Sequence, residues 1–128
     1  MPDYPKPYQT YGNSGTALLE SMSDYFAMLE KKYGHEPGLL YGVAMTESSG
    51  NPNAIGPMTK QGRAKGAFQF VDSTAEEWGL KGNDVFDIRK SAEAAARYFS
   101  WLRQQTGSTD GMLAAYNGGI GKKRKKSN

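Results

Sequence analysis

The sequence has no cysteine and one histidine, His35, among its 128 residues. Without cysteine, a disulfide scaffold, a thiol nucleophile and a cysteine-based zinc site are all excluded. One histidine cannot form a multi-histidine metal site, so we expect no metal and no other cofactor. His35 is also the one histidine available for a serine–histidine pair.

Long apolar runs are lacking as well. The longest weakly polar run covers residues 38–45, whereas a membrane-spanning helix needs roughly 20 apolar residues. The first seven residues hold three prolines and no apolar segment. We therefore predict neither a transmembrane segment nor a secretory signal peptide.

Valine and isoleucine are scarce, six in all, whereas alanine, leucine and methionine total 27. This balance favours helix over sheet. Only 19 residues are Leu, Ile, Val or Phe, but 15 aromatic residues can anchor a core. The composition therefore predicts one mainly α domain.

Turn residues and hydrophobic spacing predict how the chain is organised. Residues 1–13 are expected to form an extended N-terminal arm, residues 14–121 the domain and residues 122–128 a basic tail, or the start of a longer protein. The predicted helices cover residues 14–33, 37–50, 73–78, 91–106 and 109–117. The third follows Ser73-Thr74-Ala75-Glu76, which has the spacing of a capping box. Residues 49–66 form a long connection, and residues 67–71 a strand or a lead-in to a helix.

Positive charge is concentrated near the C-terminus. Without the tail the chain has 11 basic and 13 acidic residues. We interpret the run as a solvated end, with contact to an acidic polymer or a membrane surface as the alternative. No specific nucleic-acid partner is expected. The run consists of Lys122, Lys123, Arg124, Lys125 and Lys126.

Glu47 is a candidate general acid. On a helical wheel it lies close to Leu40 and Val43, on the apolar face and in the last turn of its helix. Burial and the negative end of the helix dipole should both raise the pKa of this carboxyl, as a general acid requires. The alternative is that Glu47 pairs with a lysine or caps a neighbouring helix.

A second catalytic carboxylate is not evident. None of the 24 residues between Glu47 and Asp72 is acidic. A glycosidase with two carboxylates would have to recruit its partner further along the chain. The candidates look like helix caps or exposed positions, and they are Asp72, Glu76, Asp84 and Asp87.

Four short blocks carry a more specific signal. They are Glu47-Ser48-Ser49-Gly50-Asn51-Pro52-Asn53-Ala54, Gly66-Ala67-Phe68-Gln69-Phe70, Ser73-Thr74-Ala75 and Ala115-Tyr116-Asn117-Gly118-Gly119. In order and rough spacing they resemble the soluble lytic transglycosylase domain, which is similar to goose-type lysozyme. The resemblance covers roughly residues 18–121. It implies a lysozyme-like helical domain with a long substrate-cleft loop and at most a small β element.

The resemblance also implies roles for single residues. Glu47 matches the catalytic acid/base of the family, and Ser48 its neighbour that contacts the sugar. Gln69 matches the glutamine that lines the cleft. The alternatives are that Ser48 caps a helix and that Gln69 bonds the backbone.

Three aromatic or amide side chains complete the implied site. Tyr116 and Asn117 match a tyrosine–asparagine pair whose hydroxyl reaches the catalytic carboxyl, although Tyr116 also suits a core. Ala67 and Phe68 replace the usual leucine and methionine of the cleft wall. Phe68, like Phe70 and Trp78, is more typical of a core than of a sugar platform.

The activity implied is cleavage of the N-acetylmuramic acid–N-acetylglucosamine bond of peptidoglycan, with closure of a 1,6-anhydro ring. The alternatives are a hydrolytic muramidase of the same fold and a non-catalytic murein-binding or structural module. Without a signal peptide, we expect the protein in a phage virion, beside other virion proteins, or delivered to the periplasm or cell wall by a non-Sec route.

Overall fold

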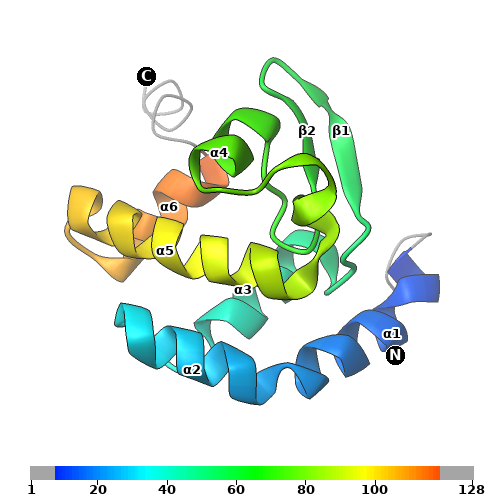
Figure 1. The fold of residues 1–128 in the computed structure, drawn as a ribbon, viewed down its shortest axis with the longest axis horizontal. Coiled ribbons are helices and arrows are strands. Elements are labelled where there is room, and N and C mark those ends of the chain that lie inside the picture. The colour runs from blue at the N-terminus through cyan, green and yellow to red at the C-terminus, as the bar shows by residue number, and fades with distance from the viewer. Residues whose placement is uncertain (1–7, 119–128) are drawn as a thin grey trace.

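The computed structural model describes residues 8–118 (Figure 1). The Asn117 side chain and the basic run at 122–126 lie outside what is described. The elements in chain order are α1 (Tyr8–Ser21), α2 (Ser23–Tyr33), α3 (Leu39–Ser48), β1 (Ile55–Thr59), β2 (Gly62–Lys65), α4 (Asp72–Glu77), the 3-10 helix η1 (Gly82–Phe86), α5 (Ile88–Thr106) and α6 (Thr109–Gly118). The prediction of a mainly helical domain with a small β element is confirmed.

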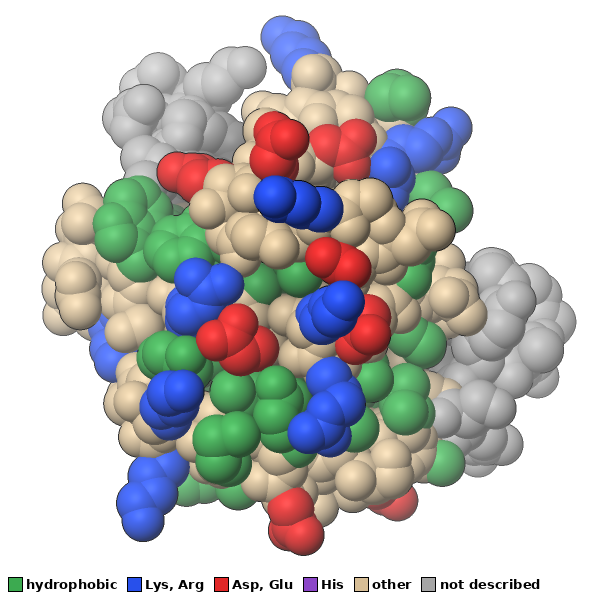
Figure 2. Space-filling view, in the orientation of Figure 1, with side chains coloured by type: hydrophobic (Ala, Val, Ile, Leu, Met, Phe, Trp, Pro, Cys, Tyr) green, Lys and Arg blue, Asp and Glu red, His purple; other side chains and the backbone are tan. Residues whose placement is uncertain are grey.

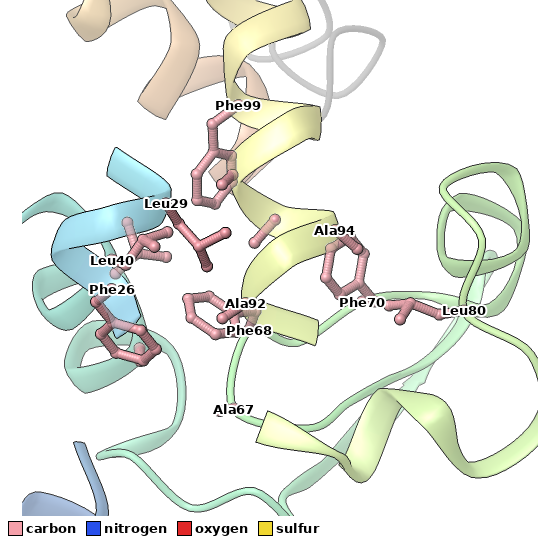
Figure 3. Close-up of a cluster of buried hydrophobic side chains, with 14 of the residues drawn as sticks. Phe26, Leu29, Leu40, Ala67, Phe68, Phe70, Leu80, Ala92, Ala94 and Phe99 are labelled. Carbon is pink, nitrogen blue, oxygen red and sulfur yellow. The ribbon is translucent and has the colours of Figure 1, made fainter. Parts of the chain in front are cut away.

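Helix α5 is the centre of the fold, in contact with α2, α3, α6 and η1. Its buried face is rich in alanine, which lets neighbouring helices approach closely. Around it, side chains from α2, α3 and the loop after β2 converge (Figure 3). Phe26 of α2 meets Phe68 of the loop edge to face, with ring centroids 6.3 Å apart. The helices and this loop therefore share one core.

The N-terminal part of the chain differs from the prediction in two ways. The helix expected over residues 14–33 is two helices, because the chain breaks at Met22. The first begins at Tyr8, inside the segment expected to be extended. No proline lies between Pro7 and Pro37. Every residue of this segment therefore has the backbone N–H that a helix interior needs.

Helix α1 crosses the C-terminal end of α3, and the two backbones are in direct contact there. The closest approach is between Gly15 of α1 and the Ser49–Gly50 segment. A Cβ atom on Gly15 would collide with the Ser49 carbonyl oxygen, and one on Gly50 would lie 2.7 Å from the Gly15 carbonyl oxygen. The glycines at both positions allow α1 to dock there.

Helix starts depend on local hydrogen bonds. The Asp87 carboxylate accepts the backbone N–H groups of Arg89 and Lys90 and so caps α5, as its interpretation as a cap predicts. The predicted capping box at Ser73 is wrong. Helix α4 begins one residue earlier, after Val71, and no side chain bonds its first turn.

The connection over residues 49–66 contains the antiparallel hairpin β1–β2, with Met58 opposite Arg63 and Thr59 opposite Gly62. A bulge lies between Ile55 and Met58. No described helix is both long and apolar enough to cross a membrane.

Candidate active site

Helix α3 carries Glu47 in its last turn and is held at both ends. At its start, the buried carboxylate of Glu30 accepts the N–H groups of Gly38 (3.2 Å) and Leu40 (2.8 Å). At its end, Ser49 takes the left-handed conformation, with φ of 56°. The amides of Ser49 and Gly50 then bond carbonyl groups of the final turn. Glu47 therefore stands on a helix with capped ends.

A groove of about 280 Å³ opens beside Glu47, between α3 and α6. Small residues of α3 leave its floor open, and Leu113 of α6 forms the opposite wall. Among the described residues that line it, Glu47 is the one that ionises. The lining consists of Gly38, Leu39, Gly42, Val43, Thr46, Glu47 and Leu113.

Burial raises the pKa of the Glu47 carboxyl above its ordinary value of 4.5. The negative end of the α3 dipole acts in the same direction. No hydrogen bond or ion pair between described residues involves this carboxyl, which disfavours the interpretation as a structural ion. Glu47 is thus suited to remain protonated until a substrate oxygen takes its proton.

The other candidate carboxylates lie outside the groove. Asp72 pairs with Lys65 at 3.2 Å, and Asp84 pairs with Lys90 at 3.3 Å. Asp87 caps α5. None of them, nor the exposed Glu76, lines the groove.

Tyr116 of α6 lies within electrostatic reach of Glu47. Burial raises the pKa of the Tyr116 phenol well above its ordinary value, and the negative charge of Glu47 raises it further. The hydroxyl is therefore a permanent donor at neutral pH. In this structure it donates to the Phe68 carbonyl oxygen and not to Glu47, contrary to the prediction.

Ser48 and Phe68 are both buried, so neither side chain faces the groove, and their sugar contacts stay predictions. Ser48 is 1% exposed, and its hydroxyl bonds the carbonyl groups of Ala44 (3.1 Å) and Ala67 (2.9 Å). Phe68 is fully buried in the core. Ser48 instead fixes the loop after β2 to the end of α3, and Phe68 packs against Phe26 of α2.

Gln69 is half-buried and does not line the groove. Its side-chain amide donates to the carbonyl groups of Gly66 (2.9 Å) and Ala54 (3.4 Å), which matches the backbone-bonding alternative. Its own backbone is left-handed, with φ of 55°. Gln69 therefore ties the loop to the start of the hairpin.

Sequence reasoning did not identify the groove itself. Gly38, Gly42 and Thr46 follow one another at i, i+4 spacing, and this stripe of small residues beside a glutamate was the available signal. The contribution of Leu113 depends on how α6 packs against α3, which periodicity does not reveal.

Comparison with known proteins adds the family. The profile of the Transglycosylase SLT domain matches residues 24–128. A similar protein is the Membrane-bound lytic murein transglycosylase C of Actinobacillus succinogenes, 31% identical over 108 residues. The alignment covers 71% of this chain, which spans 29% of the relative. No solved structure matches significantly.

Proposed function

The chain belongs to the transglycosylase SLT domain family, and from this premise we propose that it is a peptidoglycan lytic transglycosylase. Its substrate is the β-1,4 bond between N-acetylmuramic acid and N-acetylglucosamine. Glu47 acts as the single general acid and base. The relative described above is named as a lytic murein transglycosylase, which supports this reaction class.

One observation carries the proposal. Glu47 is a half-buried carboxyl with a raised pKa, and it is the one ionisable group among the described residues that line its groove. Two-carboxylate glycosidases place a second acid within about 10 Å of the first. A groove with one carboxyl suits a reaction in which the substrate supplies its own nucleophile.

The steps follow from this chemistry. The Glu47 carboxyl donates its proton to the glycosidic oxygen while the bond from that oxygen to C1 of N-acetylmuramic acid breaks. The acetamido group of the same sugar stabilises the cationic C1. Glu47, now a carboxylate, takes the proton of the C6 hydroxyl as its oxygen bonds to C1. The products are a 1,6-anhydro end and a free 4-hydroxyl group, and no water is consumed.

Mass spectrometry of purified peptidoglycan after digestion tests the reaction. We expect 1,6-anhydromuramoyl ends and few new reducing ends. Glu47→Gln is the matched control, because glutamine keeps the shape of the side chain but cannot donate the proton. Mostly reducing N-acetylmuramic acid ends would identify a muramidase, and no cleavage by the parent protein would leave a binding or structural module.

The wall contact of the basic run at 122–126 and delivery by a virion or another non-Sec route stay predictions from the sequence. Neither is needed for the chemistry of Glu47.

A further inference from the structure

We infer that Trp78, Tyr98 and Trp101 form a second glycan-binding surface, separate from the groove at Glu47. Its ligand is a β-linked strand of N-acetylated sugars. The choice of this ligand rests on the proposed function, whereas the surface itself is a feature of the fold. We call these three residues the aromatic platform.

The platform joins two helices. Trp78 ends α4, while Tyr98 and Trp101 lie one turn apart on α5. The rings of Tyr98 and Trp101 are stacked, with centroids 6.4 Å apart and an interplanar angle of 17°. Trp78 lies 5.4 Å from Tyr98 and 6.1 Å from Trp101. The three rings thus support one another before any ligand arrives.

This surface is open to solvent. Trp101 is 40% exposed, and Trp78 and Tyr98 are half-buried. Figure 2 shows hydrophobic side chains gathered on this side of the molecule, over the C-terminal half of α5. Trp101 and its two partly exposed neighbours thus present aromatic surface to a ligand.

The polar side-chain atoms of the platform make no hydrogen bond to the described residues. Between described residues, no hydrogen bond uses the indole N–H of Trp78 or Trp101 or the hydroxyl of Tyr98, and no buried polar atom lacks a partner. The described part of the fold therefore does not engage these donors. Burial, with help from Glu77, raises the pKa of Tyr98, so its hydroxyl stays a donor. Three donors line an apolar surface.

Sugar rings match this combination. The faces of a β-linked pyranose carry C–H groups with slight positive charge, and an aromatic face is negative. The hydroxyl and acetamido oxygens at the edge of the ring accept hydrogen bonds from N–H and O–H donors. A purely apolar partner would cover these donors without giving them a hydrogen-bond acceptor, which is unfavourable. The pattern therefore favours a glycan over an apolar protein surface.

The platform is also linked to the groove. Tyr98 contacts Tyr116 edge to face at 6.2 Å, and Tyr116 lies within electrostatic reach of Glu47. A strand held on the platform remains close to the site of cleavage without occupying it. Long strands should therefore benefit from the platform, and short oligosaccharides should not.

Tryptophan fluorescence tests the site directly, because Trp78 and Trp101 are the two tryptophans of the chain. We would titrate the Glu47→Gln protein, which cannot cleave, with chito-oligosaccharides and with soluble uncrosslinked glycan strands. The expected result is a saturable change in emission, tighter for the longer strands. No emission change at millimolar sugar would overturn the inference.

Variants separate the platform from the groove. Trp101→Ala should weaken strand binding at least five-fold, whereas Trp101→Tyr should retain most of the affinity. Met28→Ala is the control: it removes a 48%-exposed side chain of α2 and should leave strand binding unchanged. With Glu47 intact, Trp101→Ala should keep turnover of short oligosaccharides within two-fold. Unchanged strand binding in Trp101→Ala would contradict the inference.

The two proposals fail differently. If the parent protein does not cleave peptidoglycan but glycans still change the tryptophan emission, the proposed reaction is wrong and the inferred glycan-binding platform is retained. If cleavage is normal and glycans leave the emission unchanged, the platform is wrong. Emission that changes with protein concentration, together with a doubled mass in sedimentation, would show that a second copy of the chain covers the rings and would also overturn the inference.

Discussion

At the scale of single residues, the buried position of Glu47 affects stability as well as chemistry. The raised pKa means that ionisation disfavours the folded state once the pH exceeds the unfolded value of about 4.5. Glu47→Gln removes this ionisation. We expect the variant to melt at the same temperature as the parent or higher at pH 7, and the two to converge below about pH 4. Thermal unfolding at both pH values measures this.

The opposite result would be informative. If Glu47→Gln melted markedly lower than the parent at pH 7, Glu47 would be a paired structural carboxylate, and the catalytic assignment would rest on the family alone.

Tyr116 gives a second prediction. Its hydroxyl bonds the Phe68 carbonyl, so Tyr116→Phe leaves that oxygen without its partner while the ring keeps its edge contact with Phe99. We expect a loss of about 1–2 kcal/mol in the free energy of unfolding, measured with urea. An unchanged free energy of unfolding would contradict a stabilising bond between this hydroxyl and the Phe68 carbonyl.

The candidate site was only partly predictable at this scale. Glu47 could be found from the wheel, because one carboxyl on an apolar helix face is visible in the sequence. Ser48 and Phe68 could not be assigned, because a family block does not reveal which way each side chain points. Their burial depends on the loop that folds over the end of α3.

At the scale of elements, the loop after β2 depends on Gly66. Its φ is 85°, and a Cβ atom there would collide with the Val85 carbonyl oxygen of η1. Gly62 has φ of 96° but open space around it, which makes it the matched control. We expect Gly62→Ala to cost about 1–2 kcal/mol and Gly66→Ala at least ~3 kcal/mol in urea unfolding. Equal losses in the free energy of unfolding for the two variants would show that the loop can move away from η1 without an energetic penalty.

Most helices were predictable because their signals are local. Gly34 and Gly107 take left-handed conformations at the ends of α2 and α5, as C-terminal glycines do. The break at Met22 was not predictable, because no glycine or proline marks it. The start of α4 was not predictable either, because tertiary packing sets it. The hairpin lacks alternating valine and isoleucine, so its strands carry little signal.

At the scale of the whole molecule, His35 joins distant parts of the core. Its Nε2–H donates to the Ala96 carbonyl at 2.7 Å, and its Nδ1 accepts from Arg103 at 3.0 Å. The contact with Arg103 requires the neutral ring, because Nδ1 can accept only when it carries no proton. Burial, with help from Arg103, lowers the pKa of His35 below its ordinary value of 6.5.

This contact predicts how stability changes with pH. Below about pH 6.5 the unfolded chain binds a proton at His35 more readily than the folded chain, so the contribution of His35 is complete above that pH and is lost as the pH falls. We expect His35→Gln to cost about 1–3 kcal/mol at pH 7.5 and less at pH 5. Urea unfolding at the two pH values gives the difference. A difference independent of pH would contradict this role.

The crossing of α1 over Gly50 has a dynamic consequence. The family match begins at residue 24, yet Gly15 of α1 lies directly on the end of the helix that carries Glu47. The amides of Ser49 and Gly50 are bonded inside that end. We expect their hydrogens to exchange with solvent through an opening that also lifts α1 away. Deuterium uptake at these two amides would therefore measure how often the N-terminal helix leaves the rest of the domain.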